Sequence, residues 1–166
     1  MTVIDTSNFL QADDIEKVML VPFAVHNGHH TDDAMENYIG VDSNGRQGRY
    51  YRLAAEKLGL VELIRNNHTI LTPIGQNFVT FNKSQQDQYM DSAIRNLPVF
   101  AAAIQFTQSQ TPPPSQSQLK QWFINLYPGE QNTAERRFYT FINYLRFVDF
   151  NTKQKLNPVV YNYNVK

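Results

Sequence analysis

Residues 44–61 read NGRQGRYYRLAAEKLGLV, and this stretch decides the fold. It opens with small and polar residues, becomes rich in Arg and Tyr, and then turns apolar before a strand-like exit. The spacing of Tyr51, Ala55 and Leu58 places one apolar stripe along a helix. The pattern therefore predicts a helix over residues 46–58, with its Arg side chains on the outer face.

A second stretch repeats this order. Residues 132–148 read NTAERRFYTFINYLRFV, and one constant offset aligns them with the first stretch. The aligned pairs are Tyr51 with Phe138, Ala55 with Ile142, Leu58 with Leu145, Val61 with Val148 and Arg49 with Arg136. The repeat predicts that the chain uses the same structural unit twice.

The residues around the first stretch predict three further helices and a hairpin. Ile15, Val18 and Met19 predict a first helix, which Asp13 or Asp14 caps and Pro22 bends or ends. Thr31 is suited to cap a short helix before the Arg-rich one, and Gly59 is suited to end the Arg-rich helix. Two β-prone runs, 61–64 and 69–71, flank a polar tip, and Thr72-Pro73 begins a closing helix. Three helices followed by a hairpin are the elements of a winged helix-turn-helix.

The second half predicts the same sequence of elements. Helices are expected over 92–107, after Ser117, and over 133–145, and a hairpin is expected to pair strands 146–150 and 156–163. The polar segment 82–88 is the expected boundary. The sequence therefore predicts a mainly α fold with small β-hairpin wings (α+β), arranged as two tandem winged helix-turn-helix units, residues 1–83 and 84–166.

Composition excludes several classes of protein. The chain has no Cys, which excludes disulfides and thiolate metal sites and favours a cytoplasmic setting. No apolar run is long enough to span a bilayer, so no membrane association is expected, and residues 1–14 do not form a signal-peptide pattern. Although 15 basic residues balance 15 acidic ones, residues 1–83 carry 7 basic and 10 acidic side chains, whereas residues 84–166 carry 8 and 5. Local charge matters more for phosphate binding than this neutral total.

The candidate DNA-binding residues lie on the two Arg-bearing helices and the two hairpin tips. Arg pairs with guanine, Gln with adenine, and Tyr, Thr and Lys with phosphate oxygens. The alternative is that these residues form an ordinary solvated helix face, and that the second unit is a structural duplicate. The set comprises Arg46, Gln47, Arg49, Tyr50, Arg52, Asn67, His68, Thr133, Arg136, Arg137, Lys153 and Lys155.

One loop is rich in side chains that bind metals, but no metal site is predicted. His26, His29, His30, Asp32 and Asp33 lie close together in the sequence. The two Asp residues already have a role in the first turn of a helix, where acids are favourable. No phosphate-cradling Gly loop and no nucleophile motif is present, so neither a catalytic centre nor a cofactor is expected.

The string 45–61, followed by TILTPIG at 69–75, resembles the winged-helix modules of bacterial restriction endonucleases, and TAERRFY at 133–139 resembles the paired second module. Tandem winged helices form the target-recognition part of type II enzymes that cut at a distance from their site. The resemblance implies that the Arg-bearing helices face the major groove. Such enzymes carry a separate nuclease domain, which this chain lacks. It implies double-stranded DNA as the partner of a monomeric chain, with a nuclease domain or subunit supplied separately.

Two other functions remain open at this point. A transcriptional or replication regulator can use the same fold, in which case a dimer and a palindromic site are expected. A winged helix can also contact a protein partner, and the neutral net charge is compatible with that alternative.

Overall fold

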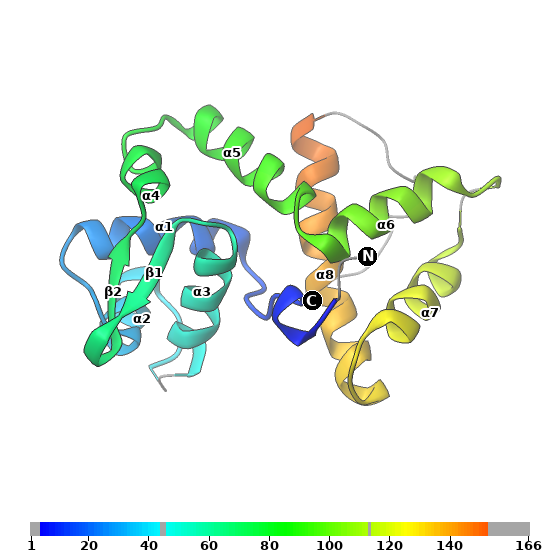
Figure 1. Ribbon diagram of the computed structural model, residues 1–166, viewed down its shortest axis with the longest axis horizontal. Coiled ribbons are helices and arrows are strands. Elements are labelled where there is room, and N and C mark those ends of the chain that lie inside the picture. The colour runs from blue at the N-terminus through cyan, green and yellow to red at the C-terminus, as the bar shows by residue number, and fades with distance from the viewer. Residues whose placement is uncertain (1–3, 44–45, 113, 153–166) are drawn as a thin grey trace. The chain divides into compact units, whose positions relative to one another are not determined.

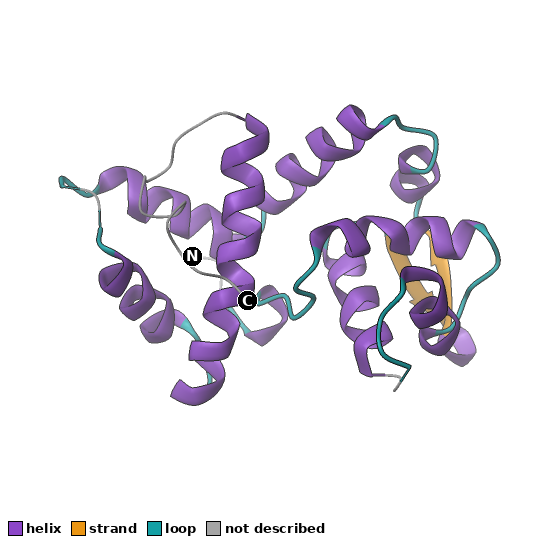
Figure 2. Cartoon of the chain, turned by 180° about the vertical axis from the view of Figure 1, so that it is seen from behind, coloured by secondary structure: helices purple, strands orange, loops and turns teal. Residues whose placement is uncertain are grey.

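The computed structural model describes residues 4–43, 46–112 and 114–152 (Figure 1). The fold is mainly α-helical with a small β component, which confirms the predicted α+β class (Figure 2). Two hairpins were predicted, and the described residues contain one small antiparallel hairpin. The chain divides into two compact units. One unit comprises Gln11–Met90, and the other comprises Met1–Leu10 together with Asp91–Lys166. The predicted boundary between 83 and 84 instead falls in the first turn of a helix.

The 11–90 unit begins with three helices. They are α1 (Ile15–His26), α2 (Asp32–Ile39) and α3 (Arg46–Lys57). Asp14 and Thr31 cap α1 and α2 by accepting hydrogen bonds from backbone N–H groups of the first turn. Pro22 lies inside α1, which continues past it to His26. The three helices pack on one another around a core in which Val18, Met35 and Ala55 are fully buried.

The hairpin follows α3 directly. Gly59, two residues after the end of α3, has a positive φ of 82°, which a residue with a Cβ rarely adopts. Strand β1 (Val61–Ile64) then pairs antiparallel with β2 (His68–Leu71), with Val61 opposite Leu71 and Ile64 opposite His68. The helix α4 (Pro73–Phe78) closes the unit, with Thr72 as its N-cap. The sequence predicted each of these elements, and the unit has the element order of a winged helix-turn-helix, three helices followed by a hairpin.

The junction between the units is a helix rather than a polar linker. Helix α5 (Lys83–Arg95) starts at Asn82, whose side chain accepts from the backbone N–H of Gln85. The Gln85 side chain in turn accepts from the backbone N–H of Asn82. This reciprocal pair is a capping box, a signal for a helix start that is present in the sequence at 82–85.

The regular secondary structure in the described part of the second unit is all helical, and it includes a short 3-10 helix, η1 (Thr6–Asn8), near the N-terminus. After α5 the chain forms α6 (Pro98–Ser109), α7 (Gln116–Leu126) and α8 (Gln131–Thr152). The predicted helix 92–107 is interrupted, because α5 ends at Arg95 and Pro98 starts α6 at a position where its missing N–H costs nothing. Ser115, rather than Ser117, caps α7 in a complete capping box.

The predicted wing of the second unit is wrong in its first strand. Residues 146–150 continue α8 and do not form a strand. Ile142, Leu145 and Val148 are each fully buried, and their spacing of three residues keeps them on one side of a helix. This burial outweighs the β propensity of Phe147, Val148 and Phe150. The second predicted strand, 156–163, lies outside the described residues.

Aromatic side chains hold the second unit together. Phe123 on α7 contacts Phe138 and Phe141 on α8, with ring centroids 5.7 and 4.7 Å apart. Phe9 near the N-terminus packs edge-on against Phe123 at 5.4 Å and against Tyr127 at 4.8 Å. These contacts explain why the first ten residues belong to this unit rather than to the unit that follows them in sequence.

Tyr89 on α5 makes the stability of the 11–90 unit sensitive to alkaline pH. Its hydroxyl donates to the Leu58 carbonyl at 2.6 Å, and burial raises its pKa above the usual 10.0. Because the folded state holds the neutral phenol, this contribution is complete below pH 10 and is lost as the pH rises through the folded-state pKa. We expect Tyr89→Phe to lower the free energy of unfolding by about 1 kcal/mol at pH 8.

Denaturant titrations at pH 8 and pH 11 check this expectation, because the difference between Tyr89→Phe and the parent protein should shrink at the higher pH. Burial also raises the pKa of Tyr51, so part of the alkaline dependence should persist in the variant. An equal difference at both pH values would contradict the role of Tyr89.

Candidate nucleic-acid interface

Helix α3 presents one polar stripe to solvent. Arg46, Arg49, Leu53 and Lys57 are exposed, at spacings of three and four residues that place them on one face. Tyr51, Ala54 and Ala55 on the opposite side are buried. The prediction that the apolar stripe of α3 faces inward is therefore correct, and Arg46 and Arg49 face outward as predicted. The outward stripe contains no acidic residue.

A close contact between α2 and α3 fixes the direction of this stripe. The buried carboxylate of Glu36 accepts a hydrogen bond from the backbone N–H of Gly48 at 2.9 Å, in the first turn of α3. A Cβ at Gly48 would lie 2.3 Å from the Asp32 carbonyl oxygen, so only glycine allows this approach. Glu36 thus satisfies an N–H group at the start of the helix, where a negative charge is favourable.

Two predicted contact residues pair with each other on the stripe. The Nε of Arg46 donates to the Tyr50 hydroxyl at 2.9 Å, and the guanidinium lies 5.9 Å from the ring centroid. Gln47 and Tyr50 are half-buried. The pair holds the Tyr50 ring beside the guanidinium of Arg46, so the two side chains form one polar surface near the start of α3.

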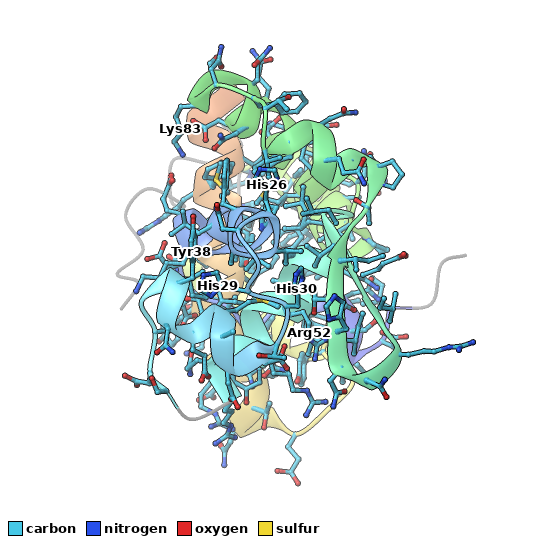
Figure 3. The ribbon with its side chains drawn as sticks, turned by 90° about the vertical axis from the view of Figure 1, so that its left-hand side faces the viewer. His26, His29, His30, Tyr38, Arg52 and Lys83 are labelled. Atoms are coloured by element: carbon cyan, nitrogen blue, oxygen red, sulfur yellow. The ribbon has the colours of Figure 1, made fainter. Side chains whose placement is uncertain are left out.

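Arg52 differs from the prediction, because it does not face outward. Its side chain is buried, and it donates from Nε to Asp32 at 2.7 Å and from Nη1 to Glu56 at 2.5 Å (Figure 3). Burial lowers the pKa of Arg52, but the hydrogen bonds and negative charges of Asp32 and Glu56 outweigh this effect and raise it. Arg52 therefore joins α3 to α2 and leaves no free donor face for a base.

A cleft lies beside the stripe. It has a volume of about 660 Å³ and brings together the start of α2, one side of α3 and the tip of the hairpin. Its lining residues are Thr31, Asp32, Asp33, Arg49, Arg52, Asn66 and Asn67. Among the described residues, Arg49 and Asp33 have no hydrogen bond or ion pair, so both are available to a ligand.

The hairpin tip contributes Asn66 and Asn67 to this cleft. Both have positive φ values, 59° and 55°, and asparagine tolerates that backbone better than other residues with a side chain. Arg65 beside them is exposed and has no partner among the residues that the structure describes. The sequence predicted contacts from the whole hairpin tip, residues 65–68, but only Asn67 and His68 were assigned individually as contact residues.

His68 is not at the tip. It is half-buried at the start of β2, and its ring stacks on His30 with centroids 4.2 Å apart. The Nδ1 of His30 lies 3.0 Å from the Thr69 carbonyl, and the backbone N–H of Thr69 donates to the His30 carbonyl at 2.8 Å. The loop before α2 thus pairs with β2 and anchors the hairpin. Within the described residues, no group of three or more His, Asp or Glu side chains is placed to hold a metal ion.

In the second unit, fewer of the predicted contact residues that the structure describes are exposed to solvent than in the 11–90 unit. At the start of α8, Arg136 is exposed and its Nη2 lies 3.4 Å from the Thr133 hydroxyl, whereas Arg137 is half-buried. Lys153 and Lys155 lie outside the described residues. In the described part of this unit no hairpin accompanies α8, so the structure does not bring these residues together with a wing.

Comparison with known proteins identifies a family. Residues 7–152 match the model of a family described as a domain of unknown function, DUF7226, and the chain belongs to this family. No curated protein and no solved structure matches the chain. No helix in the described part of the chain is both long and apolar enough to cross a membrane.

Proposed function

We propose that this member of the DUF7226 family binds double-stranded DNA through its 11–90 unit. In this proposal α3 enters the major groove and the hairpin tip lies against the adjacent backbone. The observation that carries the proposal is the unpaired Arg49. It lies on the outward stripe of a third helix and lines a cleft shared with the hairpin tip.

The charge distribution around this site supports the proposal. Arg49 and Arg65 are exposed and unpaired among the described residues, and Arg46 and Lys57 lie on the same helix face as Arg49. Glu56 on α3 is engaged by Arg52 and turned away from the stripe. Local positive charge near the groove attracts phosphate even when the net charge of the chain is zero.

The anchoring of α3 supports the same conclusion. Glu36 fixes the start of the helix through Gly48, and Arg52 fixes its middle through Asp32. A helix held in this way loses little additional conformational entropy on binding, so contacts made by its outer side chains contribute more fully to affinity. The site residues that face solvent are thus supported by residues that do not contact the ligand.

Binding of the protein to a randomised duplex library at two salt concentrations tests the proposal. We expect Arg49→Ala to weaken binding to the selected duplex by about 1–3 kcal/mol and to relax base choice at one position. Arg65→Ala should weaken binding uniformly across sequences and reduce the salt dependence, as expected for a phosphate contact.

Lys83→Ala is the matched control. It removes one positive charge from the same unit, but Lys83 contacts Glu16 and Asp87 and lies far from Arg52 (Figure 3). Arg136→Ala tests whether the second unit also reads DNA. Unchanged binding by both Arg49→Ala and Arg65→Ala would refute the assignment to α3 and the hairpin.

We extend the proposal to the biological setting that the resemblance implies. The chain would act as the target-recognition part of a type II restriction endonuclease, with a nuclease domain or subunit supplied separately. Selection of an asymmetric motif by a monomer supports this setting. A palindromic motif bound by a dimer would instead support a transcriptional or replication regulator.

Exposed apolar side chains favour one alternative function, the binding of a protein partner. Leu53 interrupts the polar stripe of α3 with 39% exposure, and Leu63 and Ile64 on β1 are 39% and 44% exposed. Leucine and isoleucine side chains have no charge and no hydrogen-bond donor, so they contribute little to phosphate contacts. If no duplex is retained at low salt, the DNA proposal fails and this apolar surface becomes the leading candidate for a binding site.

A further inference from the structure

We propose that the cleft beside α3 reads a G·C base pair, and that Asp33 is a specificity-determining residue of this site. This inference rests on the proposed DNA binding. Arg49 would donate to O6 and N7 of guanine, and the Asp33 carboxylate would accept from N4 of cytosine. The juxtaposition of these two side chains in one cleft, each without a partner among the described residues, is the observation that points to such a ligand.

Arg49 and Asp33 have opposite charges but do not form an ion pair. Elsewhere in the same cleft the corresponding groups are satisfied, since Arg52 engages Asp32 and Glu56. The cleft therefore offers one free cationic donor and one free anionic acceptor. A ligand that complements both must itself present acceptors and donors.

A phosphate group does not meet this requirement. It has acceptor oxygens and negative charge, so Arg49 and the amides of Asn66 and Asn67 suit it, but Asp33 repels it. The major-groove edge of a G·C pair presents two acceptors on guanine and one donor on cytosine. An A·T pair also presents a donor, on adenine N6, but this donor takes the place of guanine O6 beside N7, so adenine lacks the two adjacent acceptors that an Arg fork prefers.

The position of Asp33 on α2 has a local reason that does not conflict with this role. It lies in the first turn of α2, which Thr31 caps through the backbone N–H of Ala34 at 3.2 Å. An acid in the first turn is favourable for the helix, and the Asp33 side chain is exposed there. Its neighbour Asp32 is paired with Arg52, which leaves Asp33 as the unpaired carboxylate among the residues that line the cleft.

The test compares base preferences selected from a randomised duplex library by the parent protein, Arg49→Ala, Asp33→Ala and Glu62→Ala. Glu62→Ala is the matched control, because Glu62 is exposed on β1 and does not line the cleft. We expect the parent motif to contain a G·C pair. Arg49→Ala should lose the guanine preference by about 5- to 150-fold, and 7-deazaguanine at that position should weaken the parent protein but not this variant.

Asp33→Ala gives the decisive result. If Asp33 reads cytosine, the variant loses discrimination at that position while its affinity for unselected duplex stays equal or rises. If Asp33 only repels phosphate, the variant binds all duplexes more tightly with unchanged preferences, as Glu62→Ala should, and the inference is overturned. A parent motif without a G·C pair also overturns it. In either case DNA binding itself survives, whereas failure of the parent protein to retain any duplex refutes both proposals. Unchanged far-ultraviolet circular dichroism confirms that Asp33→Ala remains folded.

Discussion

Gly48→Ala should lower the free energy of unfolding of the 11–90 unit by about 3 kcal/mol, the upper end of the usual cost of overpacking. The added Cβ would lie 2.3 Å from the Asp32 carbonyl oxygen, 2.9 Å from its carbonyl carbon and 2.7 Å from Glu36 Cγ. Two of these atoms belong to the backbone of α2, so rotation of a side chain cannot relieve the contact. The helices would have to separate, which also lengthens the hydrogen bond from Gly48 to Glu36.

The sign of this effect is informative. In an unconstrained helix, Ala is more favourable than Gly by about 1 kcal/mol, so helix propensity alone predicts that the variant is stabilised. Thermal or denaturant unfolding of the variant decides between the two. Gly129→Ala is a useful comparison, because its Cβ would meet the ring of Tyr127 at 2.7 Å, and a ring can move. A stabilised Gly48→Ala would show that α2 and α3 do not pack this closely.

Arg52→Ala should cost about 2–3 kcal/mol of stability. Breaking a buried ion pair by removing one partner costs about 3–5 kcal/mol, because the remaining charge loses its compensation. Here the side chains of Asp32 and Glu56 are 28% and 29% exposed, so water can partly solvate them and the expected cost is reduced. Loss of the packed aliphatic part of Arg52 adds to the effect.

A double-mutant cycle with Asp32→Ala measures this interaction directly. We expect the double variant to be more stable than the sum of the two single effects predicts, by about 1 kcal/mol or more. At a temperature where Arg52→Ala is folded, its affinity for duplex DNA should remain close to that of the parent protein, unlike that of Arg49→Ala. Additive effects in the cycle would show that Arg52 and Asp32 do not interact. A loss of base preference in Arg52→Ala would show that Arg52 contacts DNA, as the sequence predicted.

The 11–90 unit was predictable because its signals are local and agree with one another. Thr31 caps α2, Gly59 adopts a positive φ after α3, and two β-prone runs at 61–64 and 69–71 flank a tight turn. The second unit lacks such agreement. Its run 146–150 has strong β propensity, but helical burial of Ile142, Leu145 and Val148 decides its structure. Only tertiary packing reveals which of the two tendencies prevails.

The sequence predicted which side of α3 its candidate contact residues occupy, but not how each of them is engaged. The outward faces of Arg46 and Arg49 follow from the apolar periodicity of α3. The inward position of Arg52 does not, because it depends on Asp32 and Glu56 being near enough to compensate a buried charge. From the sequence alone, Asp33 has only the role of an acidic residue in the first turn of α2. Its place in the same cleft as Arg49 becomes visible only when the structure brings α2, α3 and the hairpin tip together.

The division of the chain also determines the order in which the two units can be completed during synthesis. Residues 11–90 form a contiguous unit, whereas the other unit needs both the first ten residues and those after Met90. Phe9 leaves the ribosome early, but its partners Phe123 and Tyr127 are made only later. Domains generally fold as units from the N-terminal end during translation, so the 11–90 unit can fold first. The segment around Phe9 can pack only after α7 has been made. In the topology of the chain, the 11–90 unit is therefore an insertion within the other unit.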